Sequence, residues 1–375
     1  MATVREENEL RLNIVEPGFS VREVVPPGGP NPPESFFDPF FCFAEDDGSV
    51  VIMDIGGQPE PGWNPNQGHG SIWRLHPDDR LTPIVPLGAI GMGCILPPVK
   101  VAPPSFKPYG GELVFCGQAL PGRSGAKAPH AVYHVPYEGG TPGLVSLIPN
   151  SGGSVAFGVP GALVGNTFGP EGSEHEGHVF FSSLMNCTVY RVREGEAEPW
   201  LICDPEHIGR TIMPYGVFFD DDGGMVLYGK EGTSYTEAAG TGSELRLWRV
   251  SNGTVADDPI EGLDEAAAFS MRANTNSVAP EGFGPFGGQS FSTTQGSANL
   301  MHVTMMPTGA LPYDSTIVRV DAEGTPHVFA DQLQSGAPTC MFVGDRMLVS
   351  RIGKSYSTGD YHETDGAIYE ITYTG

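Results

Sequence analysis

Short apolar runs separated by turns rich in glycine, proline and acidic residues recur along the whole chain. The runs contain mostly Val, Ile, Leu, Phe and Tyr, and the segments between them carry the residues that favour tight turns. One clear example is Gly216–Phe219, which is followed by the turn 220–224 and then by Met225–Tyr228. This pattern predicts many short β-strands joined by hairpins.

One strand phrase occurs six times. It consists of an aromatic or aliphatic residue, a central residue that is usually arginine, and an aliphatic residue. The central residues, which lie 60, 57, 58, 70 and 51 residues apart, are Arg74, His134, Arg191, Arg249, Arg319 and Glu370. Each copy follows two further strand-like runs. Because four strands every 50 to 70 residues is typical of a β-propeller blade, we expect an all-β, six-bladed β-propeller with four-stranded blades.

The repeat also predicts the domain organisation. We expect one domain over residues 1–375, with blades at about 36–86, 91–148, 159–203, 214–260, 285–331 and 337–375. The sixth copy has no fourth run before Gly375, whereas an unpaired run occupies residues 20–26. This N-terminal strand would complete the last blade, close the ring and remove an exposed strand edge. The one helix-like stretch covers 263–272.

Composition and charge exclude several partners. The chain has 52 Gly and 35 Pro, and its 45 acidic against 20 basic residues give a net charge of −25. Such a chain repels nucleic acid and anionic membranes, so we expect neither as a partner. It has no long apolar segment and no N-terminal apolar signal segment.

None of the six cysteines forms a CxxC pair, which favours buried thiols in a reducing compartment over a zinc site. We expect a cytoplasmic monomer or homodimer.

One phrase points to a known family. The segment Met213–Gly223 (MPYGVFFDDDG) resembles the "PNG-aliphatic-x-F-x-x-D-G" phrase of the SMP-30/gluconolactonase-like family, and Val51–Ile55 is similar to its first-blade strand. That superfamily includes calcium-dependent lactonases, phosphotriesterases and strictosidine-synthase-like proteins. The resemblance implies a six-bladed propeller with a small-molecule site at the top of the channel.

The family's metal ligands are only partly matched. The positions at which the innermost strands reach the channel correspond to Asp38, Met92, Pro160, Tyr215, Phe286 and Thr339. Only Asp38 is a good ligand for a hard cation, whereas calcium needs roughly six to eight oxygen ligands. The resemblance therefore implies Ca²⁺ or another divalent cation at Asp38, and a protein without any metal is equally compatible with the sequence.

The long connections between second and third strands are expected to lie on the ligand-binding face. They and the starts of the first strands supply the expected substrate-binding residues, namely Trp63, Arg210, Lys230, Tyr235, Phe286, Tyr313, Tyr356 and His362. The candidate catalytic residues are Asp38, His69, His207 and Tyr215. Asp38, His69 or His207 would activate water or remove a proton, and Tyr215 with Lys230 or Arg210 would stabilise developing negative charge. Asp54 is a further carboxylate expected near the channel mouth.

The segment Glu174–His178 (EHEGH) has the residue types of a metal site. It joins the first and second strands of its blade, on the opposite face, and it lacks the HExxH spacing that places two histidines on one helix face. We therefore expect a solvated acidic loop. No GxSxG motif occurs, so a serine nucleophile has no support.

Two classes of function remain open. The first is an enzyme acting on a small molecule, above all a lactone or ester hydrolase, with a metal-free lyase, cyclase or condensing enzyme as the alternative. The second is a propeller that binds a ligand or a protein without catalysis. Propellers serve both uses, so the fold alone does not decide between them.

Overall fold

The computed structural model of the 375-residue chain describes residues 12–26, 39–54, 70–90, 99–118, 130–148, 163–183, 186–220, 222–238, 245–260, 276–294, 316–331, 333, 339–351 and 366–375. These residues are mostly β-strands. The helical elements among them are short: α2 (Pro205–Ile208), α3 (Tyr235–Ala238) and the 3₁₀ turn η2 (Gly284–Phe286). The helix-like stretch expected at 263–272 lies outside the described residues.

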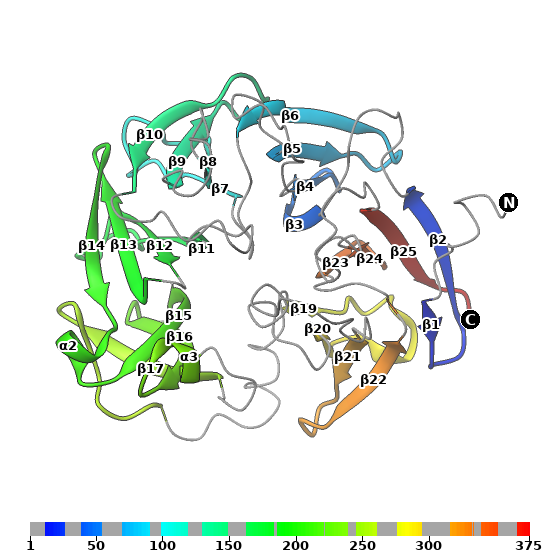
Figure 1. The fold of residues 1–375 in the computed structure, drawn as a ribbon. Coiled ribbons are helices and arrows are strands. Elements are labelled where there is room, and N and C mark those ends of the chain that lie inside the picture. The colour runs from blue at the N-terminus through cyan, green and yellow to red at the C-terminus, as the bar shows by residue number, and fades with distance from the viewer. Residues whose placement is uncertain are drawn as a thin grey trace, which may run out of the picture. The chain divides into compact units, whose positions relative to one another are not determined.

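The strands form six antiparallel sheets (Figure 1). The first three are β3 (Pro39–Ala44), β4 (Val50–Asp54), β5 (Gly70–Leu75) and β6 (Leu81–Ile90); β7 (Val99–Val101), β8 (Leu113–Gln118), β9 (His130–Val135) and β10 (Gly143–Leu147); and β11 (Leu163–Phe168), β12 (Val179–Ser183), β13 (Thr188–Arg193) and β14 (Glu196–Ile202). Within each sheet, neighbours in the sequence are neighbours in space. We call these sheets blades one to three.

The other three sheets follow in the same way. Blade four contains β15 (Thr211–Phe219), β16 (Met225–Gly232), β17 (Leu245–Ser251) and β18 (Thr254–Val255). Blade five contains β19 (Asn276–Val278), β20 (Ser290–Thr294), β21 (Thr316–Val320) and β22 (Pro326–Asp331), and blade six β23 (Thr339–Val343), β24 (Arg346–Arg351) and β25 (Ala367–Tyr373). The predicted fold class, an all-β six-bladed propeller, is thereby confirmed.

The N-terminal segment adds an outer strand to two of the blades. The strand β2 (Phe19–Val25) pairs with β25 from Phe19 opposite Tyr373 to Val25 opposite Ile368, as predicted. The short strand β1 (Asn13–Ile14) was not predicted, and it pairs with β22 as a fifth strand of blade five. The Asn13 side-chain amide also donates to Asp331 Oδ1 over 2.9 Å. The chain start therefore covers an otherwise open strand edge in each blade.

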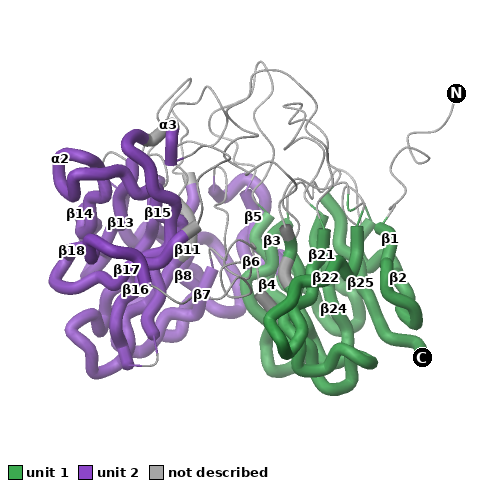
Figure 2. The backbone as a smooth tube through the Cα atoms, turned by 90° about the horizontal axis from the view of Figure 1, so that it is seen from below, with its two compact units in different colours: residues 1–62, 74–82, 263–375 green, residues 63–73, 83–262 purple. Residues whose placement is uncertain are grey.

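The described chain divides into two compact units (Figure 2). Unit 1 covers residues 1–62, 74–82 and 263–375, and unit 2 covers residues 63–73 and 83–262. Blades five and six belong to unit 1, and blades two, three and four belong to unit 2. The second strand of each blade leads to the third at one end of the sheet, which we call the loop end. We call the opposite end of the sheet the turn end.

The repeated central residue has a structural role at the turn ends. In most blades it pairs with a polar residue of the first hairpin or of the loop between the first two strands. These pairs are Arg74–Glu45, His134–Glu112, Arg249–Asp220, Arg319–Gln289 and, with the charges reversed, Glu370–Arg346. In blade three the partner of Arg191 is Glu198 on the adjacent strand. The recurring arginine therefore links strands within a blade.

A second repeat joins the first and second strands of blades two, three and five, and the sequence analysis did not identify it. The loops 102–112, 169–178 and 279–289 each begin with Ala-Pro or Gly-Pro. In the first and last, an alanine amide donates across the loop, Ala102 to Glu112 O and Ala279 to Gln289 O, and in the second Gly169 donates to His178 O. Blade five was predicted to begin at residue 285, but its first strand is β19, which precedes the loop 279–289. Phe286, near the predicted start, belongs to the 3₁₀ turn of this loop and not to a strand.

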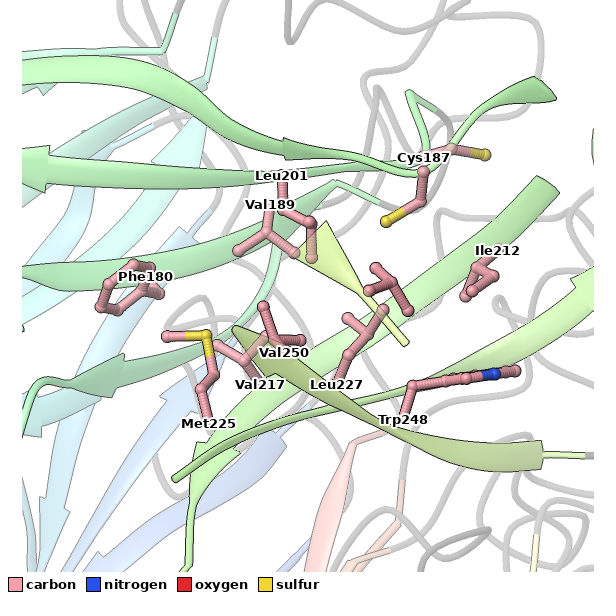
Figure 3. Packing of buried hydrophobic residues seen from close by; sticks show 12 residues of the cluster. Phe180, Cys187, Val189, Leu201, Ile212, Val217, Met225, Leu227, Trp248 and Val250 are labelled. Atoms are coloured by element: carbon pink, nitrogen blue, oxygen red, sulfur yellow. The ribbon is translucent and has the colours of Figure 1, made fainter. Parts of the chain in front are cut away.

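Apolar side chains pack between neighbouring sheets. In unit 2, one buried cluster joins blade three to blade four and contains Phe180, Val189, Leu201, Ile212, Leu227 and Trp248 (Figure 3). The second and third strands supply buried residues on both faces because each sheet is covered on both sides. The cluster holds the start of β15 against blade three, which positions the loop end of blade four.

Candidate functional site

The loop end of blade four gathers most of the predicted site residues that the structure describes. His207 lies on α2, Arg210 follows it, Tyr215 lies on β15, Lys230 on β16 and Tyr235 on α3. The other predicted residues Asp38, Trp63, His69, Tyr313, Tyr356 and His362 lie outside the described residues. Phe286 lies elsewhere, in unit 1.

Strand pairing explains why these segments meet. Thr211 at the start of β15 is opposite Gly232 at the end of β16, and Met213 is opposite Lys230. The helix α2 therefore leads into this end of the sheet and α3 leads away from it, so both lie at one end of unit 2 (Figure 2). A Cβ on Gly232 would lie 2.5 Å from the Ala238 nitrogen, which shows how closely α3 folds back on β16.

His207 and Asp204 form an imidazole–carboxylate dyad. His207 Nδ1 lies 2.7 Å from Asp204 Oδ1, and the same oxygen accepts the His207 backbone amide over 3.0 Å as the N-cap of α2. Partial burial would raise the pKa of Asp204, but the hydrogen bonds from His207 outweigh it and lower that pKa. An ionised carboxylate favours the proton on Nδ1 and leaves Nε2 as the basic nitrogen. The His207 side chain is 50% exposed, so water and ligands can reach it.

Glu231 lies between two arginines at the same end of the sheet. Its Oε1 is 3.2 Å from Arg210 Nε, and its Oε2 is 3.5 Å from Arg246 Nη1. The Arg210 guanidinium also donates to the carbonyl oxygens of Asp257 and Ala256, over 2.6 and 2.7 Å. These contacts show that Arg210 holds the segment after β18 against the blade. Its predicted substrate contact stays a prediction.

Two tyrosines and a lysine lie on the sheet itself. Tyr215 occupies the irregularity between Pro214 and Gly216 on β15 and is half-buried, as is Lys230. Tyr228 and Lys230 are two residues apart on β16 and so share one face of the sheet. Burial raises the pKa of Tyr228 to about 12, which keeps its hydroxyl protonated. A Cβ on Gly216 would lie 2.6 Å from that hydroxyl, so this position needs glycine.

Phe286 has a packing role instead of the expected place at the channel mouth. It belongs to η2 in the loop between β19 and β20, at the turn end of blade five. Its ring stacks on Phe19 with centroids 5.8 Å apart, and the Arg319 guanidinium lies 4.4 Å from the Phe286 ring centre. The resemblance placed it on an innermost strand because the second loop repeat was not recognised.

Unit 1 holds a buried polar group that the sequence analysis recognised only in part. Asp54 ends β4 and is fully buried, and its expected place near the channel mouth stays a prediction. Arg351 ends β24 and is 1% exposed, and it was not singled out. Nearby, Thr339 Oγ1 and Ser350 Oγ are 2.5 Å apart, and the Phe41 amide donates to Thr339 Oγ1. Gly117 and Gly229 occupy the position equivalent to Arg351 on the second strands of blades two and four. An alignment of the blade sequences would therefore have shown Arg351 to be unusual at this position.

The Glu174–His178 loop differs from the expected solvated loop. Its glutamates Glu174 and Glu176 are exposed, but His175 packs against Phe180 and Trp200, and His178 is only 5% exposed. Burial lowers the pKa of both imidazoles. The histidines are therefore packing residues, while the carboxylates alone face the solvent.

Within the described ranges, no group of three or more His, Cys, Asp or Glu residues is arranged to hold a metal ion. The predicted metal position at Asp38 lies outside those ranges and stays a prediction. No helix among the described residues is long and apolar enough to cross a membrane.

Comparison with solved structures reveals a shared fold. The α-L-arabinanase of Penicillium chrysogenum, solved with arabinobiose, is 13% identical, with 94% of this chain and 97% of that chain covered and a TM-score of 0.52. A mutant of the α-L-arabinofuranosidase of Fusarium graminearum, solved with an iminosugar inhibitor, gives the same values. A putative gluconolactonase is 11% identical over 96% of this chain and 93% of that chain, with a TM-score of 0.44. No protein-family model and no curated protein sequence matches the chain.

Proposed function

We propose that the protein is an enzyme that hydrolyses a small-molecule lactone or ester at the loop end of blade four, with His207 as the general base. The observation that carries the proposal is the 2.7 Å contact between His207 Nδ1 and Asp204 Oδ1 on an exposed helix. A carboxylate on Nδ1 fixes the ring and makes Nε2 the proton acceptor, which is the arrangement that general-base chemistry requires.

The reaction follows from these groups. His207 Nε2 takes a proton from water while the water oxygen attacks the ester carbonyl carbon. The carbonyl oxygen gains negative charge, which Tyr215 and Lys230 would stabilise. The carbon–oxygen bond of the ester then breaks, and the imidazolium returns its proton to the leaving oxygen. A lactone would give one hydroxy acid, and an open ester an acid and an alcohol.

The first substrates to test are lactones derived from sugars. This choice is supported by the arabinanase and the arabinofuranosidase named above, which share the fold and act on sugars. The panel consists of D-glucono-1,5-lactone, γ-butyrolactone and 4-nitrophenyl acetate, each with and without a chelator. General-base catalysis contributes about 10²- to 10⁴-fold, so His207→Gln is expected to lower kcat/KM by about that factor.

The chain offers a matched control. His327 Nε2 lies 2.7 Å from Asp321 Oδ2 in a partly buried imidazole–carboxylate pair, which is located at the start of β22 at the turn end of blade five. His327→Gln is expected to keep full activity. The proposal fails if none of the substrates is turned over or if both variants behave alike. Loss of activity with chelator but not with His207→Gln would instead favour a metal-dependent site.

A further inference from the structure

A lysine lies on the first strand of blade two, on the side that meets blade three. Lys100, in the middle of β7, is directly opposite Val114 on β8. Directly opposite residues of an antiparallel pair project from the same face of the sheet. Val114 belongs to a buried cluster that joins blade two to blade three and also contains Phe181 of β12. The Lys100 side chain therefore extends from blade two toward blade three.

An asparagine projects into the same interface from the other side. Asn166 on β11 is directly opposite Phe181, a member of that cluster, so its side chain extends toward blade two. Its side-chain amide donates to the Val114 carbonyl oxygen over 3.1 Å, and the residue is 2% exposed. Lys100 and Asn166 thus both lie next to Val114, and an amine and an amide enter the interface at one place.

The amine of Lys100 has no acidic partner. The chain has 45 acidic residues and only five lysines, so a lysine without a carboxylate is unusual in this protein. Within the part of the chain that the structure describes, Lys100 forms no hydrogen bond and no ion pair through its side chain. Burial lowers its pKa, and no described charge counteracts that effect. A larger share of this amine is therefore unprotonated at neutral pH than in an exposed lysine.

An unprotonated amine in apolar surroundings is a nucleophile, and its usual target in proteins is a carbonyl carbon. The Lys100 side chain is half-buried rather than enclosed, so a small molecule can reach it. The neighbouring cluster residues are apolar apart from Asn166 and offer no charged group to a ligand. These surroundings suit a small carbonyl compound without a charge.

We propose that Lys100 is a covalent binding site for a small uncharged aldehyde, which its amine captures as an imine. The site is separate from the proposed hydrolytic site, because it lies between blades two and three and not at the loop end of blade four.

The chemistry balances without an oxidant or a reductant. The Lys100 nitrogen attacks the aldehyde carbon, and the carbonyl oxygen takes up the proton that the nitrogen loses. The resulting carbinolamine then releases its hydroxyl group with the second nitrogen proton as water. One amine and one aldehyde thus give one imine and one water, and hydrolysis of the imine returns both.

The test is incubation of the full chain at neutral pH with glycolaldehyde and cyanoborohydride, followed by digestion and peptide mass spectrometry. Cyanoborohydride reduces the carbon–nitrogen double bond and makes the adduct permanent. Lys107, which is exposed in the same blade, is the internal reference. We expect the Lys100 peptide to gain the adduct several times faster than the Lys107 peptide in the folded protein, and at the same rate in urea. Labelling of Lys107 at the same or a higher rate in the folded protein would overturn the proposal.

Two variants form a matched pair. Lys100→Met has a side chain of similar length without the amine and should abolish the fast labelling, whereas Lys107→Met should leave it unchanged. Removal of a buried amine that has no counter-charge should not weaken the fold, which urea denaturation checks. Fast labelling that persists in Lys100→Met would overturn the assignment, and the comparison of the two peptides in the wild type needs no variant.

A second aldehyde tests the ligand class. Glyoxylate is of similar size and carries a negative charge, so it should label Lys100 more slowly than glycolaldehyde does, each rate being divided by that of Lys107. Faster labelling by glyoxylate would show that the site selects anions and would overturn the choice of an uncharged ligand.

The two proposals fail separately. Lys100→Met should hydrolyse lactones and esters like the wild type, and His207→Gln should be labelled like the wild type. Labelling at Lys100 without turnover of any ester would sink the hydrolase proposal and leave the aldehyde site intact.

Discussion

Arg22 on β2 and Glu370 on β25 form a two-point ion pair between the first and last long strands of the chain. Arg22 Nε lies 2.8 Å from Glu370 Oε1, and Arg22 Nη2 lies 2.8 Å from Oε2. The same guanidinium reaches Asp79 over 2.6 Å, and Arg346 reaches Glu370 Oε2 over 2.8 Å. Glu370 stands where four of the other repeats have arginine, and here the closing strand supplies the cation. The network therefore fastens the N-terminal strand to blade six.

Replacing Arg22 should weaken this attachment. Arg22→Met leaves Glu370, whose side chain is only 8% exposed, with Arg346 alone. We expect a loss of about 1 to 2 kcal/mol in the free energy of unfolding, since Arg22 itself is half-exposed and the pair is partly screened. Urea denaturation measures it. Arg80→Met, which removes an exposed pair with Asp78, should change stability by less than about 0.5 kcal/mol. Equal effects of the two variants would contradict this role.

Acid should weaken the same network. Burial would raise the pKa of Glu370, but hydrogen bonds from Arg22 and Arg346 outweigh it and lower that pKa. A carboxyl whose pKa is lower in the folded than in the unfolded state stabilises the fold at pH values above its unfolded-state pKa of about 4.3. This stabilisation is lost as the pH falls from that value through the lower folded-state pKa. The stability difference between wild type and Glu370→Gln should therefore shrink between about pH 5 and pH 3. A difference that is constant over this range in urea titrations would refute the assignment.

The histidine His178 should add a second, separate pH dependence. Burial, followed by Arg191 and Arg193, lowers its pKa in the folded state. The unfolded chain then binds the proton more readily, so wild-type stability should fall as the pH drops from about 7 through the unfolded value of about 6.5. His178→Gln removes this group and should flatten the curve between pH 7 and 5. Parallel stability curves for the two proteins would rule it out.

Ser350 should matter through Thr339. Ser350 Oγ accepts the Thr339 amide over 3.1 Å and shares a hydrogen bond with the Thr339 hydroxyl, and both residues are buried. Ser350→Ala leaves a buried amide without its acceptor, at a cost of about 1 to 3 kcal/mol. Ser182 Oγ is equally buried, and no hydrogen-bond partner exists for it among the described residues. Ser182→Ala should therefore be nearly neutral in thermal or urea unfolding, and a larger loss there than at Ser350 would contradict the argument.

Gly169 should tolerate no side chain. A Cβ at this position would lie 1.8 Å from the His175 carbonyl oxygen, which is backbone and is held by the loop. Gly169→Ala is expected to cost about 3 kcal/mol. Gly172, in the same loop, has φ +77° and no atom near its Cβ position, so Gly172→Ala should cost only the left-handed strain of about 1 to 2 kcal/mol. A reversed order of the two melting temperatures would show that the close contact does not exist.

Local patterns were sufficient for the fold class. The copies around Arg74, Arg249 and Arg319 gave the blade number because each strand and its hairpin are encoded by neighbouring residues. The pairing of the N-terminal strand with Ala367–Tyr373 followed from an incomplete last copy, and the structure confirms it. The two-residue strand β1 was too short to leave a pattern, so its pairing with β22 appeared only in three dimensions.

Candidate residues were harder to place than strands. His207 was named from its loop, but its partner Asp204 depends on α2, a helix of one turn whose cap is visible only once it has folded. Phe286 was placed on an innermost strand, whereas it packs on Phe19, which is far away in the sequence. Contacts between side chains that are far apart in the sequence do not affect the residue pattern around either one, so they cannot be predicted from that pattern.

The sequence by itself determined the number of blades, the order of most strands and the closing of the last blade, because alternation and turn residues act over a few positions. Only the tertiary structure decided that Arg22 meets Asp79 and that Asp204 contacts the His207 ring. Such contacts depend on strand register and on how one sheet packs against the next, and both are set by the burial of many residues together.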